Sequence, residues 1–168
     1  SAVVASNIPH AVGAALAAKR LGKNQVVMGV FGDGATEEGV YHESMNFAVL
    51  HRLPVLFLCE NNGLAVHSTL PARQGYDILE HAQSYGLPVQ LISDGYDLDT
   101  VTQMMSELVQ RVRITQETAF VEIRTYRYKE HVGPGEDFHF GYRRREEWCS
   151  WNQRDPLNQY PDLRKMLE

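Results

Sequence analysis

Short apolar runs alternate along the chain with segments in which apolar residues recur at helical spacing. The runs are bounded by Gly, Pro or polar residues and are typical of strands buried on both faces of a sheet. We expect four such strands, at residues 25–31, 54–59, 88–93 and 119–124.

Helices are predicted between these strands and after the last of them. Residues 9–21 are small and apolar throughout, with Pro9 suited to a first helical turn and Gly22 to a stop, so this helix should be buried. The remaining helices are expected at residues 38–51, 77–85, 98–112, 144–152 and 161–167, with a turn at 155–161.

Strands that alternate with helices predict an α/β fold, a parallel sheet with helices on both faces. A chain of 168 residues that is 43% hydrophobic is long enough for one domain. We divide it into an α/β core at 1–125, a loop at 126–142 and C-terminal helices at 143–168. The loop is rich in Gly, His and aromatic residues, and long ordered loops in compact domains are usually functional.

Charge and cysteine usage narrow the class of protein. The net charge of −5 arises from 16 basic and 21 acidic residues, and the one basic run, at 143–145, is followed at once by Glu146 and Glu147. We therefore expect no nucleic-acid partner. No apolar stretch reaches the ~20 residues of a membrane span. Cys59 and Cys149 lie far apart, outside any metal-ligand spacing, which is compatible with a reducing cytoplasm.

The chemically distinctive segment follows the first predicted strand. Open parallel sheets bind ligands beyond the carboxyl ends of their strands, where this chain places Gly32, Asp33 and Gly34. The glycines let the backbone approach a ligand, and the N–H groups of the next helix favour an anion. Because the Asp33 carboxylate would repel a phosphate at ~3 to 4 Å, the segment predicts a cation between them.

Magnesium fits this requirement, since it takes six oxygens and is commonly shared between carboxylates and phosphates. Asn61 and Asn62 follow the second predicted strand. The Asn62 amide oxygen and the Leu64 carbonyl would join Asp33, two diphosphate oxygens and a water around the ion.

Other interpretations of these motifs are weaker. A dinucleotide-binding turn would need a third glycine at position 37, where Glu37 stands, and the Gly-Lys-Ser/Thr of a P-loop is absent. A lone Gly-Asp-Gly is usually just a tight turn. Here 26 residues separate Gly34 from Asn61 and hold one helix and one strand, and this pairing favours a cofactor site.

The same pairing resembles the thiamine diphosphate fingerprint. Residues 32–66, with 8–17 before them and 125–148 after them, resemble the alpha subunit of the decarboxylating component of 2-oxo acid dehydrogenases (pyruvate, branched-chain and acetoin type). Transketolases share the Gly-Asp-Gly but differ around the second asparagine. The resemblance covers nearly the whole chain and implies the diphosphate-binding domain of the thiamine diphosphate fold.

Site residues follow from this resemblance. Asp33 and Asn62 match magnesium ligands, Leu64 matches a carbonyl ligand where the family often has tyrosine, and Gly34 and Ala35 match backbone donors to the diphosphate.

Three apolar positions match residues of the family that line the cofactor. Ala2 and Val4 match positions beside the aminopyrimidine, and Val66 matches a residue near the bent cofactor. Plain core packing is an equal alternative for all three.

His131 is the candidate catalytic residue. A lone loop histidine is usually a surface residue, but His131 stands where the family has a histidine that reaches the diphosphate and the reacting centre. Tyr142 and residues 143–145 resemble the end of the same loop; the alternative is a solvated helix start paired with Glu146 and Glu147.

The implied reaction is oxidative decarboxylation of a 2-oxo acid with acyl transfer to a lipoyl carrier, with a lipoyl acyltransferase as a further partner. In this family the glutamate that activates the cofactor belongs to a beta subunit. Glu37, Glu38 and Glu43 of this chain are expected at the diphosphate end, which is the wrong end for that role. We therefore expect a hetero-oligomeric enzyme. The alternatives are a non-oxidative carboligating enzyme and an inactive cofactor-binding remnant.

Two departures from the family stand out. Val132 and Gly141 occupy the places of serines that are phosphorylated in mammalian members, so that regulation is not expected. The upstream part of the family, including a tyrosine-arginine pair, has no counterpart, and the chain starts without methionine; we expect a fragment or a processed chain.

Overall fold

A four-stranded parallel sheet forms the centre of the molecule. The computed structural model describes residues 3–160 and 162, and its long strands are β1 (Val27–Gly32), β2 (Val55–Asn61), β5 (Val89–Ile92) and β6 (Ala119–Arg124). They lie in the order β1-β2-β6-β5, and every neighbouring pair is parallel. The expected parallel arrangement is confirmed.

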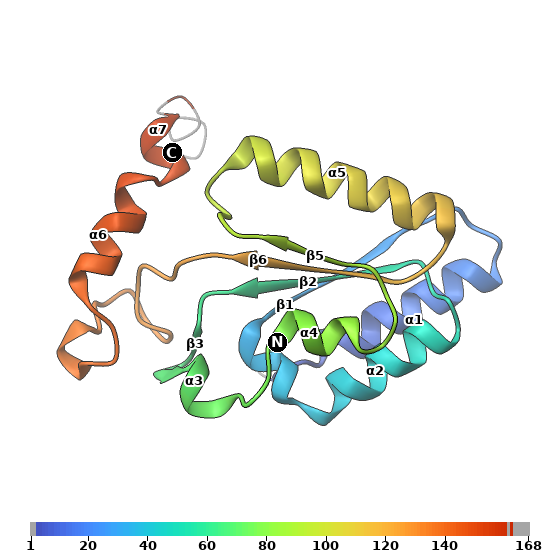
Figure 1. Cartoon of the computed structure of the whole chain (residues 1–168), viewed down its shortest axis with the longest axis horizontal. Helices are drawn as coiled ribbons and strands as arrows, with labels where there is room; N and C mark the ends of the chain where they lie inside the picture. Colours follow the sequence, from blue (N-terminus) through green and yellow to red (C-terminus); the bar gives the residue numbers. More distant parts are fainter. Residues whose placement is uncertain (1–2, 161, 163–168) are drawn as a thin grey trace.

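Helices cover both faces of this sheet, as predicted (Figure 1). One face carries α1 (Asn7–Arg20), α2 (Gly39–Leu50) and α4 (Ile78–Gln83), and the other carries α5 (Leu98–Thr115). Because successive side chains of a strand point to opposite faces, Phe57 of β2 joins the cluster of α1, α2 and α4 while Leu56 joins the cluster under α5. Burial on both sides explains why the sequence of β2 is continuously apolar.

The first strand departs from the expected burial. Phe31 of β1 is buried beneath α1 and α2, but Met28 and Val30 on the other face are 41% and 40% exposed. β1 lies at the edge of the sheet, and the cluster under α5 is built on β2, β5 and β6. The prediction that this strand is buried on both faces was therefore wrong.

Several small elements and the segment 125–160 lie beyond the carboxyl ends of the strands (Figure 1). A 3-10 helix η1 (Asp33–Glu37) follows β1, and a hairpin of β3 (Leu64–Ala65) and β4 (Ser68–Thr69) follows β2 and leads into the short helix α3 (Leu70–Arg73). The loop after β6 contains the 3-10 helix η2 (Phe138–Phe140) and ends at α6 (Arg145–Gln153). This edge is where the sequence placed the ligand site.

The segment predicted as a turn at 155–161 instead contains helix α7 (Pro156–Gln159). The Asp155 carboxylate accepts a hydrogen bond of 2.8 Å from Leu157 N–H, and Pro156 presets the backbone of the first turn. The helix predicted at 161–167 lies outside the described residues except for Asp162. Within the described ranges, no helix is both long and apolar enough to cross a bilayer.

Candidate cofactor site at the carboxyl edge of the sheet

Asp33 and Asn62 lie next to each other at the ends of two neighbouring strands. β1 and β2 pair in register up to Gly32 and Glu60, so the residues that follow each strand emerge side by side. Asn62 N–H donates a hydrogen bond of 3.4 Å to Asp33 Oδ1, and Asp33 is only 1% exposed. The structure thus brings the Asp33 side chain against the backbone of Asn62, a residue 29 positions later in the chain.

Two side-chain turns shape the segment after β2. Asn61, which is the last residue of the strand, accepts a hydrogen bond of 2.8 Å from Gly63 N–H through Oδ1. Asn62 Oδ1 accepts one of 3.0 Å from Leu64 N–H. Asx turns of this kind hold a tight chain reversal, and Gly63 has the positive φ of 74° that favours glycine. Leu64 then enters the β3–β4 hairpin, opposite Thr69.

Gly34 and Ala35, the expected backbone donors, lie in the first turn of η1, where N–H groups have no partner inside the helix. α2 starts only at Gly39, so the helix next to Asp33 is the 3-10 turn. A Cβ on Gly34 would come within 3.0 Å of Ala65 Cβ. The close approach of β3, not a special backbone conformation, therefore favours glycine at position 34.

The donor set fits a hard cation. Asp33 supplies a buried carboxylate, and Asn62 supplies an amide oxygen whose second lone pair remains after the bond to Leu64. These oxygens, with the Leu64 carbonyl, are of the kind that Mg²⁺ prefers. Among residues 3–160 and 162, no three His, Cys, Asp or Glu side chains gather in a metal-binding group. A metal here would therefore depend on amide and carbonyl oxygens as well as Asp33.

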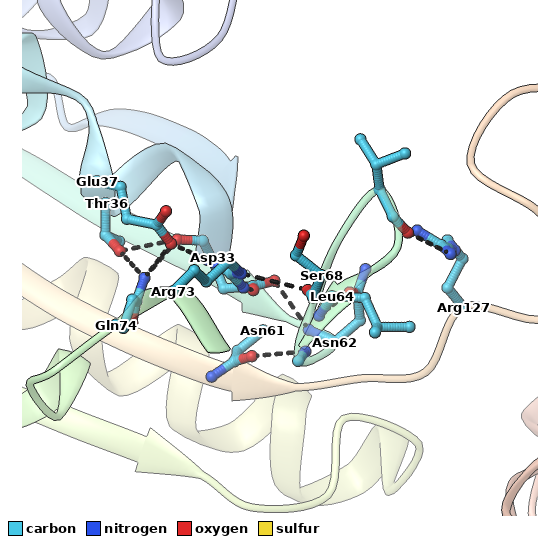
Figure 2. A network of polar contacts seen from close by, with 12 residues as sticks. Asp33, Thr36, Glu37, Asn61, Asn62, Leu64, Ser68, Arg73, Gln74 and Arg127 are labelled. Carbon is cyan, nitrogen blue, oxygen red and sulfur yellow. Dashed lines mark hydrogen bonds and ion pairs between the residues drawn. The ribbon is translucent and has the colours of Figure 1, made fainter. Parts of the chain in front are cut away.

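Sequence reasoning missed Arg73. Its Nη2 contacts Asp33 Oδ2 and its Nη1 contacts Glu37 Oε1, with the Arg73 side chain 10% exposed (Figure 2). The next residue, Gln74, donates from Nε2 to Thr36 Oγ1 at 2.8 Å. Arg73 closes a short helix that begins Leu-Pro, but a pairing across 40 residues leaves no local signal.

The predicted apolar contacts of the cofactor are less well defined. Val4 and Val66 are 55% and 46% exposed, so neither is a core residue, and Ala2 lies outside the described residues. Val66 has a positive φ of 55°, and its carbonyl accepts a hydrogen bond of 2.9 Å from Arg127 Nη2. This bond joins the hairpin to the start of the loop after β6 (Figure 2).

His131 lies exposed in that loop, and its catalytic role stays a prediction. The same loop contains Asp137, which is fully buried and bonded to three other side chains. Arg143 Nε donates to Asp137 Oδ1 at 2.6 Å, and Arg127 Nη2 and the Tyr142 hydroxyl both contact Oδ2. Sequence reasoning did not single out Asp137.

The three arginines at 143–145 lie in different environments, one buried in the loop and two exposed. Arg143 is 7% exposed and belongs to the loop. Arg145 opens α6 at the surface, where it pairs with Glu136, whereas Glu146 and Glu147 were the expected partners. Arg144 is exposed.

Burial shifts the pKa of two ionisable side chains beneath the site. It raises the pKa of the Cys59 thiol, and the carboxylates of Glu122 and Asp33 raise it further. Cys59 is therefore a protonated core residue and not a nucleophile, as its apolar surroundings suggested. Burial likewise raises the pKa of Glu122, while a hydrogen bond from Asn61 opposes that shift.

Comparison with known proteins shows similarity over almost the full chain. The model of the family described as "Dehydrogenase E1 component" matches residues 1–165. The 2-oxoisovalerate dehydrogenase subunit alpha of Bacillus subtilis is 35% identical over 161 residues, which cover 95% of this chain and 48% of that protein. The pyruvate dehydrogenase E1 component subunit alpha of Staphylococcus aureus is 32% identical, covering 99% and 44%. The chain thus spans less than half the length of these curated relatives.

An X-ray structure from Mycobacterium smegmatis, described as that of a candidate thiamin diphosphate-dependent enzyme, shares the fold. It superposes with a TM-score of 0.59 at 22% identity and covers 74% of this chain and 22% of that one. At this identity the likeness concerns the fold alone, and it agrees with the expected thiamine diphosphate-binding architecture.

Proposed function

The chain belongs to the dehydrogenase E1 component family, and on that premise we propose that it binds the diphosphate of thiamine diphosphate through Mg²⁺. The membership confirms the family resemblance drawn from the sequence. The adjacency of Asp33 and Asn62 is the observation that supports the cofactor role, because it places a buried carboxylate beside the residue whose side-chain amide would be the second metal ligand.

Asp33, Asn62 and the Leu64 carbonyl would hold the metal, and N–H groups of Gly34 and Ala35 would face the diphosphate. When bound, the cofactor supplies the nucleophilic carbon and the electron sink for decarboxylation of a 2-oxo acid. The chain's own residues orient the diphosphate end. His131 is proposed to reach that end from the loop after β6 and to interact there with phosphate or with developing charge.

Catalysis is proposed to need a second subunit that supplies the glutamate for the aminopyrimidine. With that subunit, the acyl group would pass to a lipoyl carrier. The relatives named above are alpha subunits of 2-oxo acid dehydrogenases, and this supports the assignment.

Calorimetric titration with thiamine diphosphate in the presence and absence of Mg²⁺ tests the cofactor role. We expect metal-dependent binding that Asp33→Asn weakens at least about 100-fold, since the ligand carboxylate loses its charge. Asp99→Asn, in the first turn of α5, is the matched control. Equal binding of the cofactor by wild type and Asp33→Asn would overturn the proposed role of Asp33 in metal-dependent cofactor binding.

The reaction requires a separate assay with the beta-type partner. Acyl transfer to dihydrolipoamide is the expected activity, and carboligation without lipoamide turnover would instead indicate the non-oxidative alternative. Cofactor binding without either activity would leave a binding remnant.

A further inference from the structure

Arg73 occupies the carboxylate that the proposed metal needs. Asp33 Oδ1 accepts Asn62 N–H at 3.4 Å, and Oδ2 is in contact with Arg73 Nη2. Both oxygens of the carboxylate therefore already have a donor. A guanidinium and a divalent cation on the same oxygen repel each other, so Arg73 and a metal compete for Asp33.

Arg73 is held by a contact of its own side chain and by hydrogen bonds of the residues that follow it. Glu37 Oε1 holds its second nitrogen, Nη1. The chain after it is attached to η1, because Gln74 Nε2 donates to the Asp33 carbonyl at 3.3 Å and the Tyr76 hydroxyl donates to the Thr36 carbonyl at 2.8 Å. The backbone therefore stays in place, and only the Arg73 side chain has to rotate to free Asp33.

A displaced Arg73 needs a new anion. Its side chain is 10% exposed and that of Asp33 is 1% exposed. Loss of one of its two carboxylate partners leaves the charge of this largely buried arginine less well compensated, which is destabilising. A diphosphate bound to a metal on Asp33 brings anionic oxygens to this position. Glu37 can keep Nη1 in both arrangements. Rotation of the guanidinium would also release Nε from the Ser68 carbonyl, to which it donates at 3.3 Å, so that Nε and Nη2 together can bind such oxygens through paired hydrogen bonds.

We propose that Arg73 is a diphosphate-binding residue that exchanges Asp33 for a diphosphate oxygen when the metal binds. Metal and diphosphate then bind cooperatively, because each removes the cost that Arg73 imposes on the other. The inference rests on the proposed cofactor role and adds to it a residue and a coupling between metal binding and diphosphate binding.

Binding of Mn²⁺, followed by its electron paramagnetic resonance signal in the full chain, tests the exchange without any turnover. Mn²⁺ is titrated alone and with thiamine diphosphate, into wild type and Arg73→Gln. In the variant we expect Mn²⁺ alone to bind about 10-fold more tightly, and the enhancement by thiamine diphosphate to fall by about 10-fold, within the usual range of coupling between sites.

Two variants keep the result interpretable. Arg52→Gln removes an arginine from an exposed ion pair with Glu117 at 3.2 Å and should change neither affinity. Arg73→Lys keeps the charge but not the paired donors, so Mn²⁺ alone should bind as in wild type while the enhancement falls. If Arg73→Gln does not fold, an unchanged enhancement in Arg73→Lys still overturns the proposal.

The outcomes separate this inference from the cofactor role. If wild type binds thiamine diphosphate with metal but Arg73→Gln leaves the affinity for Mn²⁺ alone unchanged or weaker, the exchange is overturned and the cofactor role stands. If wild type binds no thiamine diphosphate with metal, both are overturned.

Discussion

The Asn61 side-chain amide donates a hydrogen bond of 2.8 Å to the carboxylate of Glu122, which is 2% exposed on the neighbouring strand β6. The other end of the same amide accepts Gly63 N–H. Glu122 thereby fixes which way the Asn61 amide points, and through it the turn that presents Asn62 and Leu64. A buried acid next to the proposed metal site thus has a positioning role.

Glu122→Gln should stabilise the fold more as the pH rises. Burial raises the folded-state pKa of Glu122, so the native state holds its proton more tightly than the unfolded state. The wild-type protein then loses stability as the pH rises from the ordinary carboxyl pKa through the raised one. Glutamine does not ionise, so the variant does not undergo this loss. Urea unfolding at about pH 4 and about pH 8 checks this. Glu60→Gln, exposed at the same edge, is the control, and a stability difference that does not widen with pH contradicts the prediction.

Gly34→Ala should destabilise the fold by about 1–2 kcal/mol, because its Cβ would overpack against Ala65. It should also weaken binding of thiamine diphosphate by displacing the β3–β4 hairpin. Chemical unfolding and calorimetry measure the two effects. Adding Ala65→Gly should restore both, and Gly39→Ala, with nothing within 4 Å of the added methyl, should have little effect. Failure of the double variant to recover would point away from this contact.

Asp137→Ala should cost about 3–5 kcal/mol, because it leaves the buried Arg143 without its carboxylate. If the loop opens locally instead, cleavage within residues 126–142 by a protease should accelerate strongly at a smaller global cost. Glu136→Ala removes the adjacent acid, whose pair with Arg145 is exposed, and should cost less than about 1 kcal/mol. Similar losses in both variants would mean that the Asp137 network does not hold the loop.

Tyr41→Phe should leave stability unchanged or raise it by about 1 kcal/mol. The Tyr41 side chain is fully buried, and its hydroxyl has no hydrogen-bond partner within the described structure, so its removal relieves a desolvation cost. Tyr76→Phe is the opposite case, since that hydroxyl donates to Thr36 at 2.8 Å, and it should lose about 1 kcal/mol. Urea unfolding of the two variants side by side decides; a loss of more than 1 kcal/mol in Tyr41→Phe would show that its hydroxyl is satisfied.

Much of the fold was predictable because buried strands and helix faces require apolar residues at regular positions in the sequence. β2 and β6 lie inside the sheet with helices on both sides, so the apolar runs around Phe57 and Val121 marked them directly. The exposed face of β1 could not be foreseen, because a strand's lateral place in a sheet is set by the other strands. The same holds for α7, where capping by Asp155 overrides the turn-like composition.

The site was predictable only where it follows the strand ends. Asp33 and Asn62 meet because parallel neighbouring strands deliver the residues after them to the same edge. Arg73 was missed because its partners, Asp33 and Glu37, lie about 40 residues earlier in the chain. Asp137 was missed because its partners lie in the same irregular loop, whose conformation follows no periodic pattern. His131 shows the converse, because its sequence context predicts a catalytic role while the structure places it exposed in the loop.

The strand order has a consequence for how the chain folds. β6 lies between β2 and β5 although it follows both in sequence, so the inner edge of β2 stays open until residues 119–124 have been synthesised. Asp33, Asn62 and Arg73 leave the ribosome earlier, before the sheet that supports them can close. Parallel pairing across such sequence distances is slow and leaves apolar strands exposed in the meantime. The nascent chain therefore carries every proposed metal ligand before the sheet beneath them is complete.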